Sequence, residues 1–132
     1  MTGDQLLLAA GRRPNTDTSN LDAAGVDTDG DGSIETDEYL ETSAENVWAL
    51  GDITGNFLFK HAANHDARHV VRNAVLGGHD HQHAVDYTVM PYAVFASPQV
   101  AGVGDSEQEL RNEKMDTQPG RTRMPTRRWG QR

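Results

Sequence analysis

The sequence contains no cysteine among its 132 residues. A chain without cysteine has no disulfide, no thiolate zinc site and no redox-active dithiol of its own. It also lacks an apolar run near the roughly 18 residues that a membrane-spanning helix needs, and no signal-peptide pattern follows Met1. We therefore expect a cytoplasmic protein with no membrane partner.

Basic residues are scarce and unevenly placed. There are 12 Lys and Arg against 20 Asp and Glu, a net charge of -8. Five of the arginines lie in residues 117–132, which contain no acidic residue, so residues 1–116 hold 7 basic and 20 acidic residues, a net charge of -13. A dense acidic surface is typical of halophilic proteins, where salt screens the self-repulsion, and an ordinary acidic cytosolic protein is the alternative.

The most informative stretch is the apolar run at residues 47–50, which ends at Gly51 and Asp52. A continuous apolar run of this length predicts a strand buried on both faces of a parallel sheet. Ligands of such sheets bind outside the carboxyl ends of the strands. Gly51 permits a ligand to approach the backbone closely, and the carboxylate of Asp52 is suited to accept hydrogen bonds from sugar or sugar-alcohol hydroxyls.

Two shorter elements are expected before this stretch. Residues 4–10 are apolar and end at Gly11 and Pro14, which predicts a second buried strand. Residues 19–24 predict about one helical turn that stops at Gly25.

The acid-rich residues 27–38 permit two interpretations. They match the calcium loop of an EF-hand, whose ligands here would be Asp27, Asp29, Asp31, Ser33 and Glu38. The flanking sequence does not predict the two helices that an EF-hand needs. The second interpretation is a hairpin, with strands at 26–28 and 33–39 around a Gly-Asp-Gly turn.

Alanine and valine recur at helical spacing through residues 58–76, and two glycines end the pattern, which predicts a helix. His61, His65 and His69 lie on one face of this helix, and three further histidines follow at positions 79, 81 and 83. A zinc site is one interpretation of these histidines. The other is that His61 lies near a ligand while the remaining histidines are solvated.

The C-terminal part predicts two strands, a helix and a tail. The strands cover residues 91–96 and 99–103, and Ser106 begins a helix with Glu109 as its capping-box acid. Residues 117–132 have no periodicity and are expected to be disordered. Although their arginines resemble a nucleic-acid-binding tail, we expect no nucleic-acid partner.

Three of these motifs together resemble the class I pyridine nucleotide-disulfide oxidoreductases. Residues 6–15 (Leu-Leu-Leu-Ala-Ala-Gly-Arg-Arg-Pro-Asn) resemble the last strand of that family's NAD-binding domain, and residues 42–52 resemble its second FAD motif. Residues 91–104 resemble the entry to its dimerisation domain. Residues 60–68 are most similar to the mycothione reductase branch, with the dihydrolipoamide dehydrogenase and mercuric reductase branches next.

The resemblance implies an α/β fold and two cofactors, FAD and NAD(P). It implies that Asp52 binds the ribitol or ribose region of FAD, that Gly11 lies against NAD(P), and that Gly51 belongs to the FAD motif. The residues that would line the flavin are Leu58, Phe59, Lys60 and His61. It also favours the hairpin over the calcium loop, and it favours no metal at the histidines.

The family's first FAD fingerprint, NAD fingerprint, redox cysteine pair and catalytic His-Glu pair have no counterpart in this sequence. The expected domains are therefore the end of an NAD-binding domain (1–15), a second FAD-binding segment (16–85), the start of a dimerisation domain (86–116) and the tail (117–132). Intact members are homodimers that pass electrons from NAD(P)H through FAD to a small-molecule disulfide. We expect this chain to be a fragment of such an enzyme that is not catalytic alone, with no catalytic residue of its own.

Overall fold

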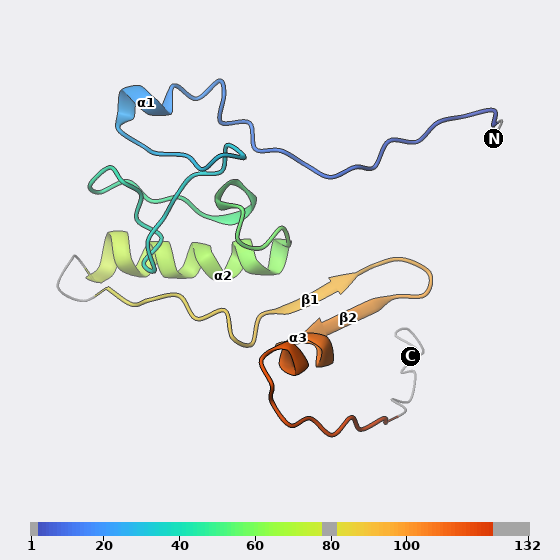
Figure 1. The fold of residues 1–132 in the computed structure, drawn as a ribbon. Coiled ribbons are helices and arrows are strands. Elements are labelled where there is room, and N and C mark those ends of the chain that lie inside the picture. Colours follow the sequence, from blue (N-terminus) through green and yellow to red (C-terminus); the bar gives the residue numbers. More distant parts are fainter. Residues whose placement is uncertain (1–2, 78–81, 123–132) are drawn as a thin grey trace, which may run out of the picture.

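The computed structural model describes residues 3–77 and 82–122. Figure 1 shows the longest helix, α2, between a layer of loops and an extended segment that leads into a β-hairpin and a last short helix. The elements are α1 (Leu21–Ala24), the 3-10 helix η1 (Gly51–Thr54), α2 (Lys60–Val70), the π-helical η2 (Val71–Gly77), β1 (Pro91–Val94), β2 (Val100–Val103) and α3 (Glu107–Asn112).

The loop layer above α2 begins with the two elements that the sequence predicts there. Helix α1 makes one turn and ends at Gly25, whose φ of 73° is the left-handed conformation that glycine adopts readily. The acid-rich residues 27–38 form a tight turn closed by a single antiparallel bridge between Thr28 and Ile34. The hairpin interpretation is therefore confirmed, with one bridge in place of two full strands.

A small apolar core lies inside this loop layer. Val26, Ile34 and Ala49 are buried together, and Leu21, Ala44 and Ile53 pack against them. Backbone hydrogen bonds join the same segments, from Ile34 N to Ile53 O at 2.9 Å and from Ala49 N to Leu40 O at 3.1 Å. The layer is thus stabilised by isolated contacts between loops, because no continuous sheet supports it within the described residues.

The prediction of buried strands at residues 4–10 and 47–50 is wrong for this structure. Residues 47–50 are extended, but only Trp48 bridges, to Glu41, and Val47 is 40% exposed. In residues 4–10 the three leucines at positions 6–8 are 81–88% exposed. A strand requires a neighbouring strand to complete its hydrogen bonds, and within the described residues the only β-bridge made by either segment is the one between Trp48 and Glu41.

The predicted helix is confirmed as α2 followed by η2, which together run from Lys60 to Gly77. Its buried face carries Ala62, Asp66 and Asn73, so two of the three buried side chains are polar. Asn73 uses its whole amide: Nδ2 donates to the carbonyls of Tyr39 and His83, and Oδ1 accepts from the His83 amide. The helix is thereby joined to the loop layer on one side and to the following segment on the other.

The C-terminal predictions are confirmed for the hairpin and its helix. β1 and β2 pair antiparallel, with Tyr92 opposite Gly102. The Tyr92 ring covers Gly102 so closely that an added Cβ would lie 2.7 Å from it, and the ring would have to move to admit a larger residue. Helix α3 begins with the predicted capping box of Ser106 and Glu109. Residues 117–122 form no helix or strand, and the rest of the predicted disordered tail lies outside the described residues.

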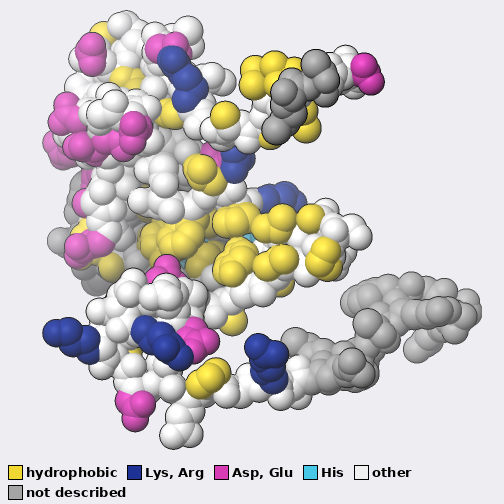
Figure 2. Space-filling view, turned by 45° about the vertical axis from the view of Figure 1, so that its right-hand side comes forward, with side chains coloured by type: hydrophobic (Ala, Val, Ile, Leu, Met, Phe, Trp, Pro, Cys, Tyr) yellow, Lys and Arg dark blue, Asp and Glu magenta, His cyan; other side chains and the backbone are white. Residues whose placement is uncertain are grey.

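Figure 2 shows one face of the molecule, with acidic side chains gathered at one side and apolar side chains on the projecting parts at the other. Part of this apolar surface belongs to the hairpin, where Phe95 is 80% and Val103 60% exposed. Within the described ranges, no helix combines the length and apolar character that crossing a membrane requires.

Candidate functional site

The candidate site is built around the turn at Gly51–Thr54, directly before α2. Gly51 has a φ of 77°, which residues with a side chain rarely adopt. A Cβ at this position would also lie 3.2 Å from the Cβ of Ala63 on α2. Glycine is therefore required by the backbone conformation and by the close contact with the helix. Thr54 closes the turn, since its hydroxyl donates to the Gly51 carbonyl at 2.9 Å.

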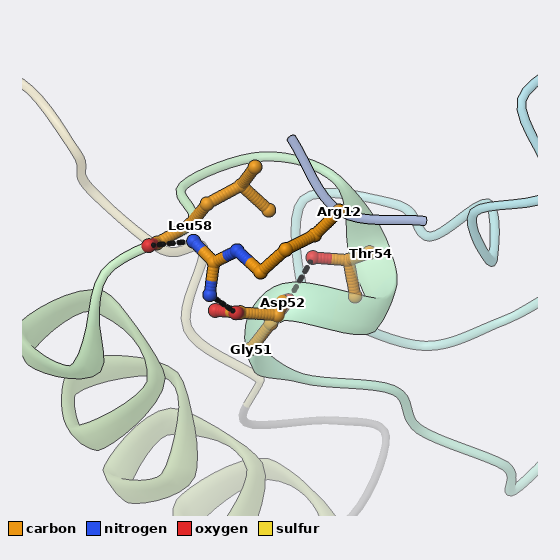
Figure 3. A network of polar contacts seen from close by, with 5 residues as sticks. All are labelled: Arg12, Gly51, Asp52, Thr54 and Leu58. Atoms are coloured by element: carbon orange, nitrogen blue, oxygen red, sulfur yellow. Dashed lines mark hydrogen bonds and ion pairs between the residues drawn. The ribbon is translucent and has the colours of Figure 1, made fainter. Parts of the chain in front are cut away.

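Asp52 follows in this turn and forms an ion pair with Arg12 (Figure 3). The same guanidinium donates through Nη2 to the carbonyl of Leu58 at 2.7 Å. Arg12 thus connects the N-terminal segment to η1, through Asp52, and to the residue before the N-cap of α2, through Leu58. The Asp52 side chain is 46% exposed, and its other carboxylate oxygen accepts no hydrogen bond from the described residues.

The turn is anchored from below by Asp66 of α2. Its side chain is 2% exposed, and Oδ2 accepts from the Gly51 amide at 3.0 Å. Oδ1 accepts from the hydroxyl of Tyr87 at 2.8 Å. Burial and this contact with Asp66 raise the pKa of the Tyr87 hydroxyl well above its ordinary value.

The start of α2 lies beside the turn. Phe59 is the N-cap residue, with extended φ and ψ of -127° and 140°, and no side chain caps the helix. Lys60 and His61 open the helix with exposed side chains, and Leu58 is 42% exposed. The free amides of a first helical turn favour negative charge, so this end of α2 is electrostatically suited to an electron-rich group.

Two of the residues predicted for cofactor binding line one cavity, whereas His61 lines a different one. Asp52 and Leu58 line an open cavity of about 560 Å³ together with Arg12, Pro14 and Ile53. Gly11, with a φ of 112°, leaves open space where a Cβ would stand. Nothing in the fold contradicts the predicted roles of these residues, which stay predictions.

The acid-rich turn uses its carboxylates internally. Asp29 Oδ1 accepts from the amides of Asp31 and Ser33, at 2.9 and 2.8 Å. The preceding helix, α1, has four residues, and no helix follows the turn directly. Within residues 3–77 and 82–122, no group of three His, Asp or Glu side chains is placed to hold a metal ion. His79 and His81 lie outside the described residues.

Comparison with known proteins agrees with this geometry. The family model described as pyridine nucleotide-disulphide oxidoreductase matches residues 1–78. The chain belongs to this family. The predicted resemblance is thereby confirmed, and the match includes the turn, Arg12 and the whole of α2.

Individual relatives extend the similarity beyond residue 78. Mycothione reductase of Mycobacterium tuberculosis is 42% identical over 118 residues, covering 88% of this chain and 26% of the relative. Dihydrolipoyl dehydrogenase 3 of Haloarcula marismortui is 39% identical over 115 residues, covering 87% of this chain and 23% of the relative. The chain thus spans about a quarter of the length of these relatives.

A solved structure shows the same fold. The HOCl-induced flavoprotein disulfide reductase RclA from Escherichia coli superposes with a TM-score of 0.68 at 34% identity, covering 79% of this chain and 23% of RclA. Members of the family bind FAD and use NAD(P)H. No finding supports the calcium-binding interpretation.

Three residues of the site were not predicted from the sequence: Arg12, Asp66 and Tyr87. Arg12 lies inside a motif that was recognised, but its contact with Asp52 joins residues 40 positions apart. Asp66 did carry a signal. It lies four positions after Ala62, hence on the same face, and a polar residue on a buried face requires a partner.

Proposed function

We propose that this chain forms one side of the FAD site in a flavin-dependent NAD(P)H:disulfide oxidoreductase. The flavin-facing segment would be residues 51–61, from the Gly-Asp turn to the first turn of α2. The observation that carries the proposal is the Gly51–Asp52 turn, fixed beside the uncapped start of α2 within the part of the chain that matches the family model.

The residues present fit this cofactor. One carboxylate oxygen of Asp52 stays available while Arg12 holds the other, so the side chain is oriented and can still accept from a ribitol or ribose hydroxyl. The amides of Lys60 and His61 are not capped by a side chain, which suits the pyrimidine end of a flavin. When bound, FAD would supply the two-electron chemistry that connects NAD(P)H to a disulfide.

In this proposal, the residues of this chain bind and orient the cofactors. Arg12 binds both the Asp52 carboxylate and the Leu58 carbonyl, and so holds these two groups close together across the loop between η1 and α2. Leu58 presents apolar surface to the same cavity, which would exclude water from an aromatic ring system, while the Phe59 ring stacks on Tyr92. Gly11, which precedes Arg12, would let the nicotinamide cofactor approach the backbone, as its positive φ and open surroundings permit.

The remaining roles lie outside this chain. With no cysteine in the sequence, the chain cannot supply a redox dithiol, so disulfide reduction would need cysteines from other polypeptide. We assign residues 1–15, 16–85 and 86–116 to the NAD-binding, FAD-binding and dimerisation domains. In the whole protein the partners would be a small-molecule disulfide and a second subunit, in the cytoplasm.

The proposal is tested by FAD binding to the purified chain, measured by flavin fluorescence. Asp52→Ala should weaken binding by about 10- to 100-fold, because a hydrogen bond to a charged group contributes about 1.5–3 kcal/mol. The matched control is Asp22→Ala, an exposed aspartate on α1 that should leave binding unchanged. Equal affinities for the parent and Asp52→Ala would remove Asp52 from the site.

A further inference from the structure

The buried carboxylate of Asp66 links two segments that are far apart in the sequence. Its two oxygens accept from the Gly51 amide at 3.0 Å and from the Tyr87 hydroxyl at 2.8 Å. Gly51 belongs to the turn before α2, whereas Tyr87 belongs to the segment that leads into β1. One side chain therefore fixes the flavin-facing segment relative to the start of the hairpin.

The partners of Asp66 are unusual for a buried acid. The side chain is 2% exposed, and no Lys or Arg of the described residues forms an ion pair with it. Burial of a carboxylate is costly unless hydrogen bonds compensate it. Here two neutral donors provide that compensation, one on each oxygen, so the loss of either donor would leave the acid underpaired and its side chain less fixed in orientation.

Tyr87 contacts the same segment at a second place. Its ring packs against Phe57 with centroids 4.9 Å apart. Through Asp66 it reaches the first residue of the turn, and through Phe57 it reaches the loop after the turn. Both ends of residues 51–57 are thus held by one aromatic side chain.

We propose that Asp66 and Tyr87 are positioning residues for the flavin-facing segment, which they hold in its FAD-binding geometry and couple to the segment that enters β1. The assignment rests on the proposed function for its ligand, but its geometry is independent of any ligand. Neither residue needs to touch FAD. Their effect passes through the backbone amide of Gly51, the neighbour of Asp52.

The test compares hydrogen exchange at two amides in the purified chain. The Gly51 amide reports the contact with Asp66, and the Ala49 amide, bonded to Leu40 O, reports the nearby core. Tyr87→Phe keeps the ring on Phe57 and removes only the hydroxyl. We expect exchange at Gly51 to rise about 3- to 10-fold, with less than a twofold change at Ala49.

Asp66→Asn keeps the shape and one acceptor, so it should raise Gly51 exchange less than Asp66→Ala does. Tyr39→Phe is the matched control, since it removes a tyrosine hydroxyl on the loop layer, away from Asp66. If Asp66→Ala fails to fold, Gly51 exchange in Tyr87→Phe still tests the positioning role. Unchanged exchange at Gly51 in Tyr87→Phe, or equal increases at Gly51 and Ala49, would overturn the positioning role.

FAD affinity is measured on the same variants. Tyr87→Phe should weaken FAD binding by a factor similar to its effect on Gly51 exchange. If the parent chain binds no FAD, the proposed function fails, while Gly51 exchange still tests the anchoring. If the parent binds FAD and Tyr87→Phe binds it equally well despite faster Gly51 exchange, the coupling to the ligand is refuted.

Discussion

Gly51 shows how much a single position can be constrained. From the sequence, this glycine is explained by the close approach of a ligand to the backbone. The structure provides a second reason, which is the left-handed φ of 77° and the contact with Ala63. Both constraints act without any ligand. The position should therefore be sensitive to substitution in the free protein.

Gly51→Ala should lower the free energy of unfolding by about 1–3 kcal/mol, from the left-handed backbone and the crowding against α2. Urea denaturation measures this. Gly30→Ala is the matched control, because a Cβ there meets nothing within 4 Å and no positive φ is required. The account of the turn is wrong if the two substitutions have the same effect.

His69 offers a test through pH. Burial and the neighbouring His65, whose ring centroid lies 4.6 Å away, lower its pKa, while the His83 backbone opposes the shift. The unfolded chain takes up this proton at about pH 6.5, but the folded chain resists until lower pH. Stability is thus complete above about pH 6.5 and should fall as the pH drops through the lowered pKa.

The melting temperature should therefore fall as the pH is lowered from about 7.5 to about 5. His69→Gln should reduce the slope of melting temperature against pH. His61→Gln, at an exposed position of the same helix, is the control and should leave the slope unchanged. A slope that is identical in His69→Gln and the parent would exclude His69 as its source.

At the scale of elements, the sequence predicts well those helices and strands that depend on residues close together in the chain. The helix from Lys60 to Gly77, the β1–β2 hairpin and the capping box of α3 depend on spacing, turn residues and neighbouring side chains. Within the described residues, residues 4–10 have no paired strand and residues 47–50 form one isolated bridge, so their apolar runs alone do not produce strands. The contacts of Arg12 and Tyr87 are likewise non-local, which is why the sequence did not indicate them.

The capping box gives a direct test of local control. Ser106 accepts from the Glu109 amide, and Glu109 Oε2 accepts from the Ser106 amide at 2.7 Å, which also lowers the pKa of Glu109. Ser106→Ala should destabilise α3 by about 1 kcal/mol. Cα chemical shifts of residues 107–112 measure the loss of helix. Glu113→Ala, at the other end, should not change them, and full helicity in Ser106→Ala would contradict the capping role.

At the scale of the whole molecule, the described residues bury a small core and expose much apolar surface. Leu40 and Ala62 are 1% exposed, whereas the leucines at positions 6–8 are more than 80% exposed. The chain spans about a quarter of the length of these relatives. The family was predictable from three motifs in order. The domain roles of those motifs remain proposals.

The most direct test of the central claim is titration of the purified chain with FAD, followed by flavin fluorescence. The account predicts saturable binding that Asp52→Ala weakens by about 10- to 100-fold and that Asp22→Ala leaves unchanged. Absence of saturable binding, or binding that is indifferent to Asp52, would contradict the claim that the Gly51–Asp52 turn and the start of α2 form one side of an FAD site.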